Sequence, residues 1–367
     1  MTKVLHVLNE LNPSGAEVML HCAAKTWQSR GIDGDILSMG KQKGSFASVL
    51  ERSGYHIHHV PFEKSIGTLL AFYRLLRKQG PDVIHIHTER CNFWYALLAF
   101  LAGVPVIVRS IHNVFSFSGT LRWRRMIQRR LLTWLGVKHV GVGASVQKNE
   151  GTRYRNPSLL IPNWYDSRHF RPPTPEERSQ SRQQLGILDQ LVIVSIGNCE
   201  GMKNHPELLK ALATLKDDLD ILYLHLGREQ ADRPERRLAE ELGIAEKVRF
   251  LGFQENVVPF LWASDVYAMP SLHEGFSIAA IEALGVGLMA ILADVPGLRD
   301  LKDLEGDSIS WTGIDAASIA PALREIAKTP REKRLEAGMS TQKTVSSRYS
   351  IETGALAYAR LYAPHQC

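Results

Sequence analysis

Short apolar runs alternate with longer amphipathic stretches along most of the 367 residues, and this alternation occurs twice. In the first half the apolar runs cover residues 4–8, 33–39, 55–60, 82–87, 104–111, 139–143 and 158–163. Near-continuous apolar strands separated by helices are typical of a parallel sheet that is buried on both faces. The first half is therefore predicted to form a doubly wound α/β domain.

A proline-rich, charged stretch at residues 166–186 interrupts this pattern and predicts a linker that runs into a short helix. The alternation then restarts, with apolar runs at residues 191–197, 220–227, 247–252, 265–270 and 288–294. We expect a Rossmann-like N-terminal domain (1–170), a second Rossmann-like domain (171–345) and a final helix (346–367). Open parallel sheets bind ligands at the carboxyl ends of their strands, so a cleft is expected there.

The composition limits the partners and the compartment. The formal charge of +6 favours an anionic partner, which could be a phosphate ligand, nucleic acid or acidic lipid. No run reaches the roughly 20 apolar residues of a membrane span, and the first residues lack the apolar region of a signal peptide. The four cysteines are scattered without metal-ligand spacing, which suits a reducing cytoplasm.

The stretch SLHEGFSIAAIEALGVG (271–287) places two glutamates eight residues apart, and Glu282 lies in an otherwise apolar run. A helix that starts near Phe276 would present free N–H groups as an anion site. Glu274 and Glu282 would then accept hydrogen bonds from hydroxyl groups at the two ends of one elongated ligand. The alternative is a surface Glu274 and a Glu282 on the solvent edge of the helix.

This stretch resembles the E-x7-E signature of the retaining GT-B glycosyltransferases of glycosyltransferase family 4, and its context from residue 251 to 301 is similar to that family nearly throughout. NPSGAE, PDVIHIH and IPNWYDSRHF are similar to further motifs of the family. The resemblance implies two Rossmann-like domains that face a central cleft, with an acceptor-binding first domain and a donor-binding second domain. It also implies that the last helix returns to the first domain.

Site residues are carried over from the family one at a time. Glu282 would accept from the ribose of the nucleotide, and Glu274 would contact the transferred sugar, as would His112. Catalytic roles are therefore expected for His112, Glu274 and Lys203, the last as the phosphate-binding lysine. The donor-binding residues implied by the resemblance are Ser14, Gly15, Gly197, Asn198, Lys203, Gly275, Phe276, Ser277 and Glu282.

Asn198 departs from the family, which usually has an arginine at this position. This removes one cation from the expected pyrophosphate site. Lys203 and the helix start must then carry more of the charge, or another cation such as Arg228 or Arg299 must reach the phosphates. The departure leaves the identity of the donor open.

No cofactor and no metal are expected beyond the nucleotide-diphosphate sugar itself. Two Asp-x-Asp strings, at residues 33–35 and 218–220, lie at predicted strand starts, the wrong end for the cleft. Retaining transfer in this family is understood to depend on positioning and on charge stabilisation of the leaving diphosphate.

A basic stretch, LRWRRMIQRRLLTWLGVK, combines arginines with tryptophans; the arginines are Arg122, Arg124, Arg125, Arg129 and Arg130. It could dock on an anionic membrane beside a lipid-linked acceptor, or be an ordinary amphipathic helix with a solvated basic face. A phosphorylated acceptor is a third interpretation, and no nucleic-acid module is present. The expected location is cytoplasmic, with peripheral binding to the inner face of the membrane left open.

The sequence thus predicts a retaining, metal-independent hexosyltransferase that acts on a hydroxyl of a glycan or lipid-linked acceptor, in the synthesis of bacterial surface polysaccharide or glycoconjugate. Two alternatives remain open. One is a GT-B sugar-nucleotide epimerase or phosphorylase, and the other is a nucleotide-sugar-binding protein without catalysis.

Overall fold

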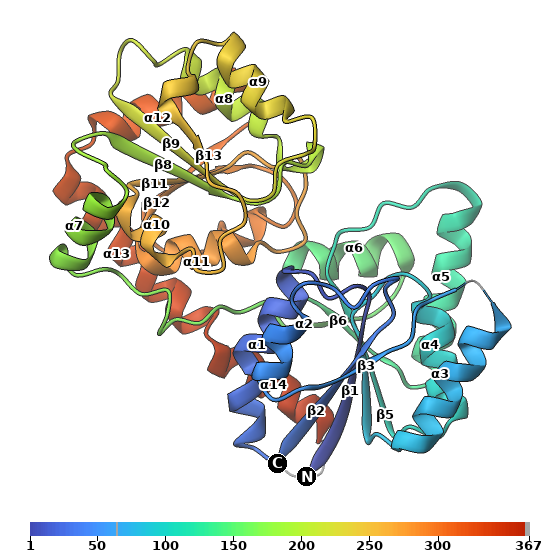
Figure 1. The fold of residues 1–367 in the computed structure, drawn as a ribbon. Helices are drawn as coiled ribbons and strands as arrows, with labels where there is room; N and C mark the ends of the chain where they lie inside the picture. Colours follow the sequence, from blue (N-terminus) through green and yellow to red (C-terminus); the bar gives the residue numbers. More distant parts are fainter. Residues whose placement is uncertain (64, 364–367) are drawn as a thin grey trace. The chain divides into compact units, whose positions relative to one another are not determined.

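The computed structural model describes residues 1–63 and 65–363. It contains two compact units (Figure 1). The first comprises residues 1–164 together with the chain from Ile351 onward, and the second runs from Tyr165 to Ser350. The first division falls six residues before the predicted domain boundary at 170/171, and the second falls five residues after the predicted start of the last segment at residue 346.

The sheet of the first unit has seven parallel strands in the order β3-β2-β1-β4-β5-β6-β7. Their bounds are β1 (Thr2–Leu8), β2 (Ile32–Ser38), β3 (His56–His59), β4 (Val83–Ile86), β5 (Val106–Ile111), β6 (Lys138–Gly141) and β7 (Leu159–Leu160). The helices are α1 (Gly15–Gln28), α2 (Ala47–Arg52), α3 (Ile66–Gln79), α4 (Asn92–Leu101), α5 (Gly119–Trp134), α6 (Ala144–Tyr154) and α14 (Ile351–Tyr362).

The two faces of this sheet differ in character because side chains alternate along each strand. Leu5 and Val7 of β1 point into an apolar core formed with α3, α4 and α5. His6 points the other way, towards the layer that contains α1 and α14, where its ring stacks on Trp27 at 5.6 Å. The second face therefore carries polar aromatic side chains inside the fold.

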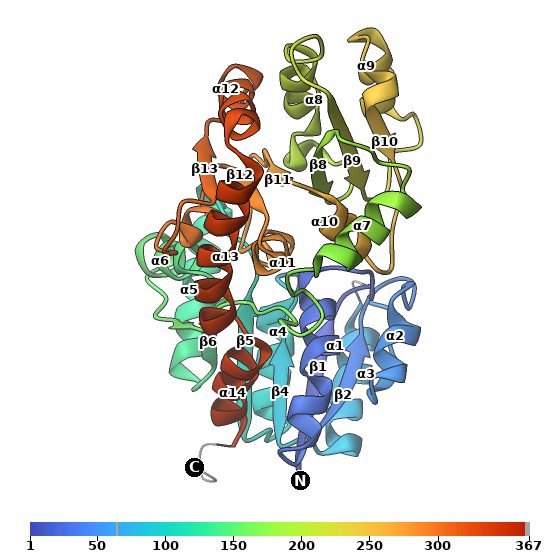
Figure 2. The same cartoon turned by 90° about the vertical axis from the view of Figure 1, so that its left-hand side faces the viewer.

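The second unit has a six-stranded parallel sheet in the order β10-β9-β8-β11-β12-β13. Its strands are β8 (Leu191–Ile196), β9 (Ile221–Leu226), β10 (Val248–Phe250), β11 (Val266–Met269), β12 (Met289–Ala293) and β13 (Ile309–Thr312). Helices α8 (His205–Ala213), α9 (Pro234–Glu241) and α12 (Ala316–Lys328) cover one face, while α7 (Pro175–Gln184), α10 (Val258–Ala263), α11 (Ile278–Val286) and α13 (Arg331–Arg348) cover the other (Figure 2).

The strand order places a topological switch point in each sheet. In the first, connections run in opposite directions from β1 and β4; in the second, they do so from β8 and β11. The loops that follow these strand pairs diverge and leave room at the sheet edge, which is where open α/β sheets bind ligands. The predicted site residues after β8 and β11 therefore meet at the same point of the second unit.

The structure adds elements that the sequence pattern did not indicate. Strand β13 has only four residues, ISWT, and lacks an extended apolar run. Helix α13 ends at Arg348, and a break at Tyr349 and Ser350 separates it from α14. The last predicted helical residues, 364–367, lie outside the described part of the chain. No helix among the described residues is long and apolar enough to cross a membrane.

Candidate active site

The loop after β8 carries Gly197 and leads through a short 3-10 turn (Gly201–Lys203) into α8. A Cβ at Gly197 would lie 3.3 Å from the Lys203 side chain, so the lysine lies along the bare backbone at the end of the strand. At Gly227, after the neighbouring β9, a Cβ would lie 2.1 Å from the Gly197 carbonyl oxygen. The two glycines thus let adjacent strand ends approach closely beside Lys203.

The loop after β11 leads into α11, which begins at Ile278, two residues later than expected. Ser277 is the N-cap, and its hydroxyl accepts a hydrogen bond from the Ala280 N–H at 3.2 Å. The helix start lies at the switch point, where its dipole and N–H groups favour an anion. The Leu272 N–H also donates to the Met202 carbonyl at 2.9 Å, which ties this loop to the one that carries Lys203.

Lys203 and Glu274 form an ion pair. The Lys203 Nζ lies 2.7 Å from the Glu274 Oε1, and both side chains are largely shielded, at 26% and 13% exposure. Gly297, with φ +87°, supports this arrangement, because a Cβ there would lie 2.3 Å from the Glu274 carbonyl oxygen. The predicted sugar-contacting carboxylate and the predicted phosphate-binding lysine are therefore direct neighbours.

Glu282 is buried in α11 at 8% exposure, and within the described part of the chain no hydrogen bond or ion pair joins its carboxylate. The alternative of a Glu282 on a solvent edge is therefore wrong. Burial raises the pKa of Glu282 to about 8. A buried carboxyl that accepts no hydrogen bond from the described residues is costly, so Glu282 is a candidate to bind the hydroxyl groups of a ligand.

Tyr267 belongs to the same group of side chains, and the sequence reasoning missed it. It lies on β11, fully buried on the face that α11 covers. Burial raises the pKa of its phenol, and the carboxylates of Glu274 and Glu282 raise it further. A tyrosine inside an apolar strand carries no sequence signal of its own, because aromatic residues are common in strand cores.

Asn198 is held to the neighbouring strand end. Its Oδ1 accepts from the Arg228 backbone N–H at 3.0 Å, which places Arg228 beside the position where a cation was expected. The Arg228 guanidinium lies over the Phe253 ring at 5.7 Å. The other candidate, Arg299, instead pairs with Asp294 at 2.6 Å. Of the two candidate cations, Arg228 is therefore the one adjacent to Asn198.

Ser14, Gly15 and His112 belong to the first unit and are described within it. Ser14 is the N-cap of α1, and Gly15 is the first helical residue. The Ser14 hydroxyl donates to the Glu17 carboxylate, and burial raises the pKa of Glu17 to about 7. These residues follow β1, at the carboxyl edge of the first sheet.

His112 follows β5 and joins a network of histidines. Its Nε2 lies 3.2 Å from the His87 Nδ1, and the His87 Nε2 lies 3.1 Å from the His6 Nδ1. Burial lowers the pKa of His112 to about 4 and the pKa of His6 to about 3. His85 packs against His87 and is hydrogen-bonded to Tyr362 at 2.6 Å and to Ser110 at 2.8 Å.

The nitrogens of His6, His85 and His87 lie within 4.8 Å of one another, close enough for a metal ion. Neutral imidazoles are suitable ligands for transition metals. However, both ring nitrogens of His85 are already engaged by hydroxyl groups. A metal would have to break one of these bonds, so the group is better satisfied as a hydrogen-bonded network.

The arginines of the predicted basic stretch divide into two groups on α5. Arg129 is buried and lies 2.8 Å from Glu150 and 3.2 Å from Glu89, and Arg125 lies 3.9 Å from Glu89. Burial raises the pKa of Glu89, but the arginine charges outweigh this and hold it below the ordinary value. Arg129 is therefore not part of a solvated basic face and is not available to an anionic surface, contrary to both interpretations of this stretch; the exposed arginines are Arg122, Arg124 and Arg130.

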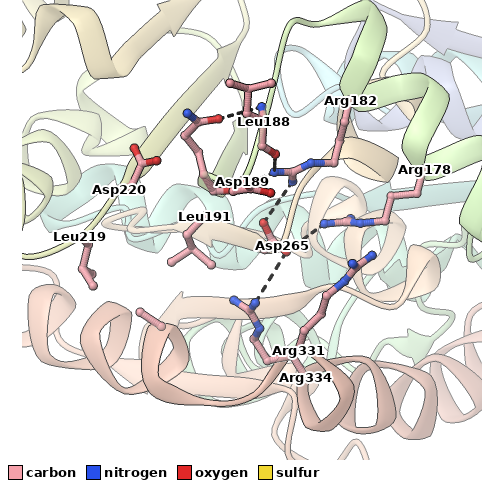
Figure 3. A pocket seen from close by; sticks show the side chains of 12 residues that line it. Arg178, Arg182, Leu188, Asp189, Leu191, Leu219, Asp220, Asp265, Arg331 and Arg334 are labelled. Atoms are coloured by element: carbon pink, nitrogen blue, oxygen red, sulfur yellow. Dashed lines mark hydrogen bonds and ion pairs between the residues drawn. The ribbon is translucent and has the colours of Figure 1, made fainter.

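A separate pocket of about 370 Å³ lies at the opposite, amino-terminal edge of the second sheet (Figure 3). Arg178 and Arg182 of α7 and Arg334 of α13 converge on Asp265, with Arg178 closest at 2.9 Å. Arg178 also donates to the Trp262 and Ser264 carbonyls. These bonds fasten α7 to the end of α10, so the pocket is built mainly from structural ion pairs.

Comparison with known proteins assigns both units. Residues 177–344 match the family described as Glycosyl transferases group 1, and residues 13–168 match the family described as Glycosyltransferase Family 4. A D-inositol 3-phosphate glycosyltransferase of Corynebacterium urealyticum is 32% identical over 317 residues, which cover 81% of this chain and 74% of that protein.

A second relative and a solved structure extend the comparison. The UDP-Gal:alpha-D-GlcNAc-diphosphoundecaprenol alpha-1,3-galactosyltransferase of Escherichia coli is 25% identical over 276 residues, covering 69% of this chain and 68% of that one. Anabaena HepE in complex with UDP-glucose superposes with a TM-score of 0.83 at 19% identity, covering 99% of this chain and all of that one. The last likeness supports the GT-B fold.

Proposed function

The chain belongs to the GT-B glycosyltransferases, and from that premise we propose that it moves a hexose from a nucleotide-diphosphate sugar to a hydroxyl group of a glycan or lipid-linked acceptor. We further propose that the transfer retains the anomeric configuration and needs no metal or cofactor. The pathway that fits these substrates is the synthesis of surface polysaccharide or glycoconjugate.

The buried Glu282 carboxyl is the observation that carries the donor assignment. It lacks a partner within the described chain, and it lies about one turn inside a helix whose start is suited to a phosphate. The vicinal hydroxyls of a ribose supply two donors to such a group. Glu274, before the helix start, would accept from the transferred sugar in the same way.

Three positive groups of the second unit would stabilise the leaving nucleoside diphosphate. Lys203 and the start of α11 meet at the switch point, and Arg228 lies beside Asn198. Cations and helix dipoles placed where negative charge develops are the main catalytic lever for a phosphate leaving group. On donor binding, we expect Lys203 to shift part of its bonding from Glu274 to a phosphate oxygen.

In a retaining transfer the acceptor hydroxyl attacks from the side that the diphosphate leaves. The glycosidic C–O bond to the diphosphate breaks, a new bond to the acceptor oxygen forms, and the acceptor proton passes to the departing phosphate oxygen. This course needs positioning of the two substrates rather than a nucleophile from the chain. We assign His112 to a hydroxyl of the transferred sugar.

Helix α5 supports a lipid-linked acceptor. Trp123, Ile127, Leu131 and Trp134 are 63%, 63%, 39% and 80% exposed, and their spacing places them on one helix face. At 100° per residue, Arg124 and Arg130, both exposed, border this apolar stripe on either side. Outward tryptophans bordered by arginines suit the interface of an anionic membrane. We therefore propose peripheral membrane binding through α5.

A ligand screen tests the donor assignment. Ligands that bind only the folded protein raise its melting temperature, by about 5–10 °C for a unit of this size at 100 times the dissociation constant. We expect one class of nucleotide-diphosphate sugar to raise it in the wild type and not in Glu282→Ala. Glu332→Gln, an exposed change on α13, is the matched control. If no such sugar shifts the wild type, the donor assignment is refuted.

The acceptor is tested by turnover. Release of nucleoside diphosphate that requires a glycan or lipid-linked acceptor supports the transferase. Conversion of the donor without any acceptor would instead indicate an epimerase, and donor binding without any turnover would indicate a binding protein.

A further inference from the structure

Three histidines of the first unit form a continuous hydrogen-bonded chain that ends at His112. They come from successive strands around the switch point, with His6 on β1, His87 directly after β4 and His112 directly after β5. The contacts are 3.1 Å from the His6 Nδ1 to the His87 Nε2 and 3.2 Å from the His87 Nδ1 to the His112 Nε2. His87 therefore uses both of its ring nitrogens within the chain.

The rings are neutral at physiological pH. Burial lowers the pKa of each of the three below its ordinary value of 6.5. A neutral imidazole has one N–H and one bare nitrogen, and an N···N contact needs one of each. Because His87 must donate with one nitrogen and accept with the other, all hydrogens along the chain must point in the same direction.

The far end of the histidine chain, at His6, selects that direction. The His6 Nε2 is fully buried and has no partner among the described residues. If the hydrogens pointed towards His6, this atom would be a buried N–H without an acceptor, and buried donors are left unpaired less often than buried acceptors. If they point towards His112, the same atom is a bare nitrogen, the Nε2 of His112 accepts from His87, and its Nδ1 carries the proton.

We infer that His87 and His6 are positioning residues that hold His112 in the Nδ1–H tautomer, so that His112 presents a fixed hydrogen-bond donor to its ligand. A donor of fixed direction suits a sugar hydroxyl or a phosphate oxygen. The His85 ring lies against the His87 ring, with centres 3.9 Å apart and planes tilted by 35°, and His85 is itself held by Tyr362, which keeps the His87 ring in place. The assignment of a sugar or phosphate ligand to His112 rests on the proposed function, whereas the tautomer of His112 does not.

The tautomer can be measured without substrate on the full chain labelled with ¹⁵N-histidine. Long-range ¹H–¹⁵N correlations distinguish protonated from bare ring nitrogens, and His112→Gln assigns the signals. We expect a protonated Nδ1 and a bare Nε2 at His112 in the wild type. His87→Ala should lose this pattern, whereas His87→Asn, whose amide N–H can replace the Nδ1 donor, should keep it. His58→Ala, outside the chain of rings, is the control.

Kinetics give the second readout. We expect His87→Ala to lower kcat by on the order of tenfold or more while the KM for the donor changes little, and His87→Asn to restore most of the loss. A wild-type His112 protonated at Nε2, or a His112 signature unchanged in His87→Ala, would overturn the inference. If the protein shows no transferase activity, the proposed function fails, and the NMR result still decides the tautomer of His112.

Discussion

At the scale of single residues, Glu282 links stability to pH. Its pKa of about 8 lies above the ordinary 4.5, so the folded protein holds this proton more tightly than the unfolded chain does. The resulting stabilisation is complete below pH 4.5 and is lost as the pH rises towards 8, at about 1.4 kcal/mol per unit at most. A glutamine at position 282 is neutral at every pH, so a Glu282→Gln variant does not lose this stabilisation as the pH rises.

The prediction is that Glu282→Gln gains stability over the wild type as pH rises from 5 to 8, measured by urea unfolding at pH 5, 6.5 and 8. Glu17 titrates in both proteins, so its contribution cancels in the difference. Glu332→Gln should show no such trend. A difference between the wild type and Glu282→Gln that does not change with pH would contradict the burial argument.

Because position 198 is Asn and not Arg, we expect Arg228 to supply the missing positive charge at the phosphate site. If it contacts the diphosphate, Arg228→Gln removes a charge-assisted hydrogen bond and weakens nucleoside diphosphate binding by about tenfold. Calorimetric titration measures this directly. Arg237→Gln, which removes an exposed cation paired with exposed Asp232, is the matched control and should bind normally. Equal affinity of the two variants would exclude Arg228 from the phosphate site.

At the scale of elements, α14 packs tightly against the other elements of the first unit. A Cβ at Gly354 would lie 2.1 Å from the Trp164 ring, and the Trp27 indole donates to the Ala355 carbonyl at 3.0 Å. Gly354→Ala should therefore destabilise the protein by about 1–3 kcal/mol through overpacking.

Gly151, inside α6, offers the matched control, since a Cβ there meets nothing within 4 Å. Gly151→Ala should be neutral or stabilise the protein by up to about 1 kcal/mol. Thermal melting of both variants makes the comparison. If Gly354→Ala is as stable as Gly151→Ala, α14 packs less closely than the structure indicates.

The exposed apolar stripe of α5 and its bordering arginines predict that the protein binds anionic vesicles. Replacing Trp123 and Trp134 by alanine removes two large exposed side chains and should lower partitioning by about tenfold or more. Vesicle sedimentation with anionic and neutral lipids measures this, and Leu335→Ala on α13 controls for loss of an exposed apolar group. Equal binding of wild type and double variant would refute the membrane role of the stripe.

At the scale of the whole molecule, the chain's own cations replace a metal in the proposed mechanism. Turnover should be unchanged by EDTA, because Lys203, the start of α11 and Arg228 supply the positive charge that the leaving diphosphate needs. NMR of the first product formed should show the anomeric configuration of the donor. Loss of activity in EDTA that is restored by a divalent cation would contradict the metal-free mechanism.

The two parallel sheets are predictable from the hydrophobic pattern alone, because strands buried on both faces require near-continuous apolar runs at regular intervals. It also indicated which loops lie together, since Lys203 and Glu274 follow strands that a doubly wound order brings side by side. Strand β13 and the break between α13 and α14 were not predictable in the same way, because short elements depend on packing more than on local pattern.

Which polar side chains are buried together depends instead on the tertiary fold. The sequence shows a basic stretch, but Glu89 and Glu150, far along the chain, turn Arg129 into a buried structural residue. The sequence also shows scattered histidines, but the alignment of β1 with β4 and the packing of α14 bring His6 and His87 into hydrogen-bonding distance. Side-chain burial and hydrogen bonding depend on contacts between residues distant in sequence, and no local pattern encodes these contacts.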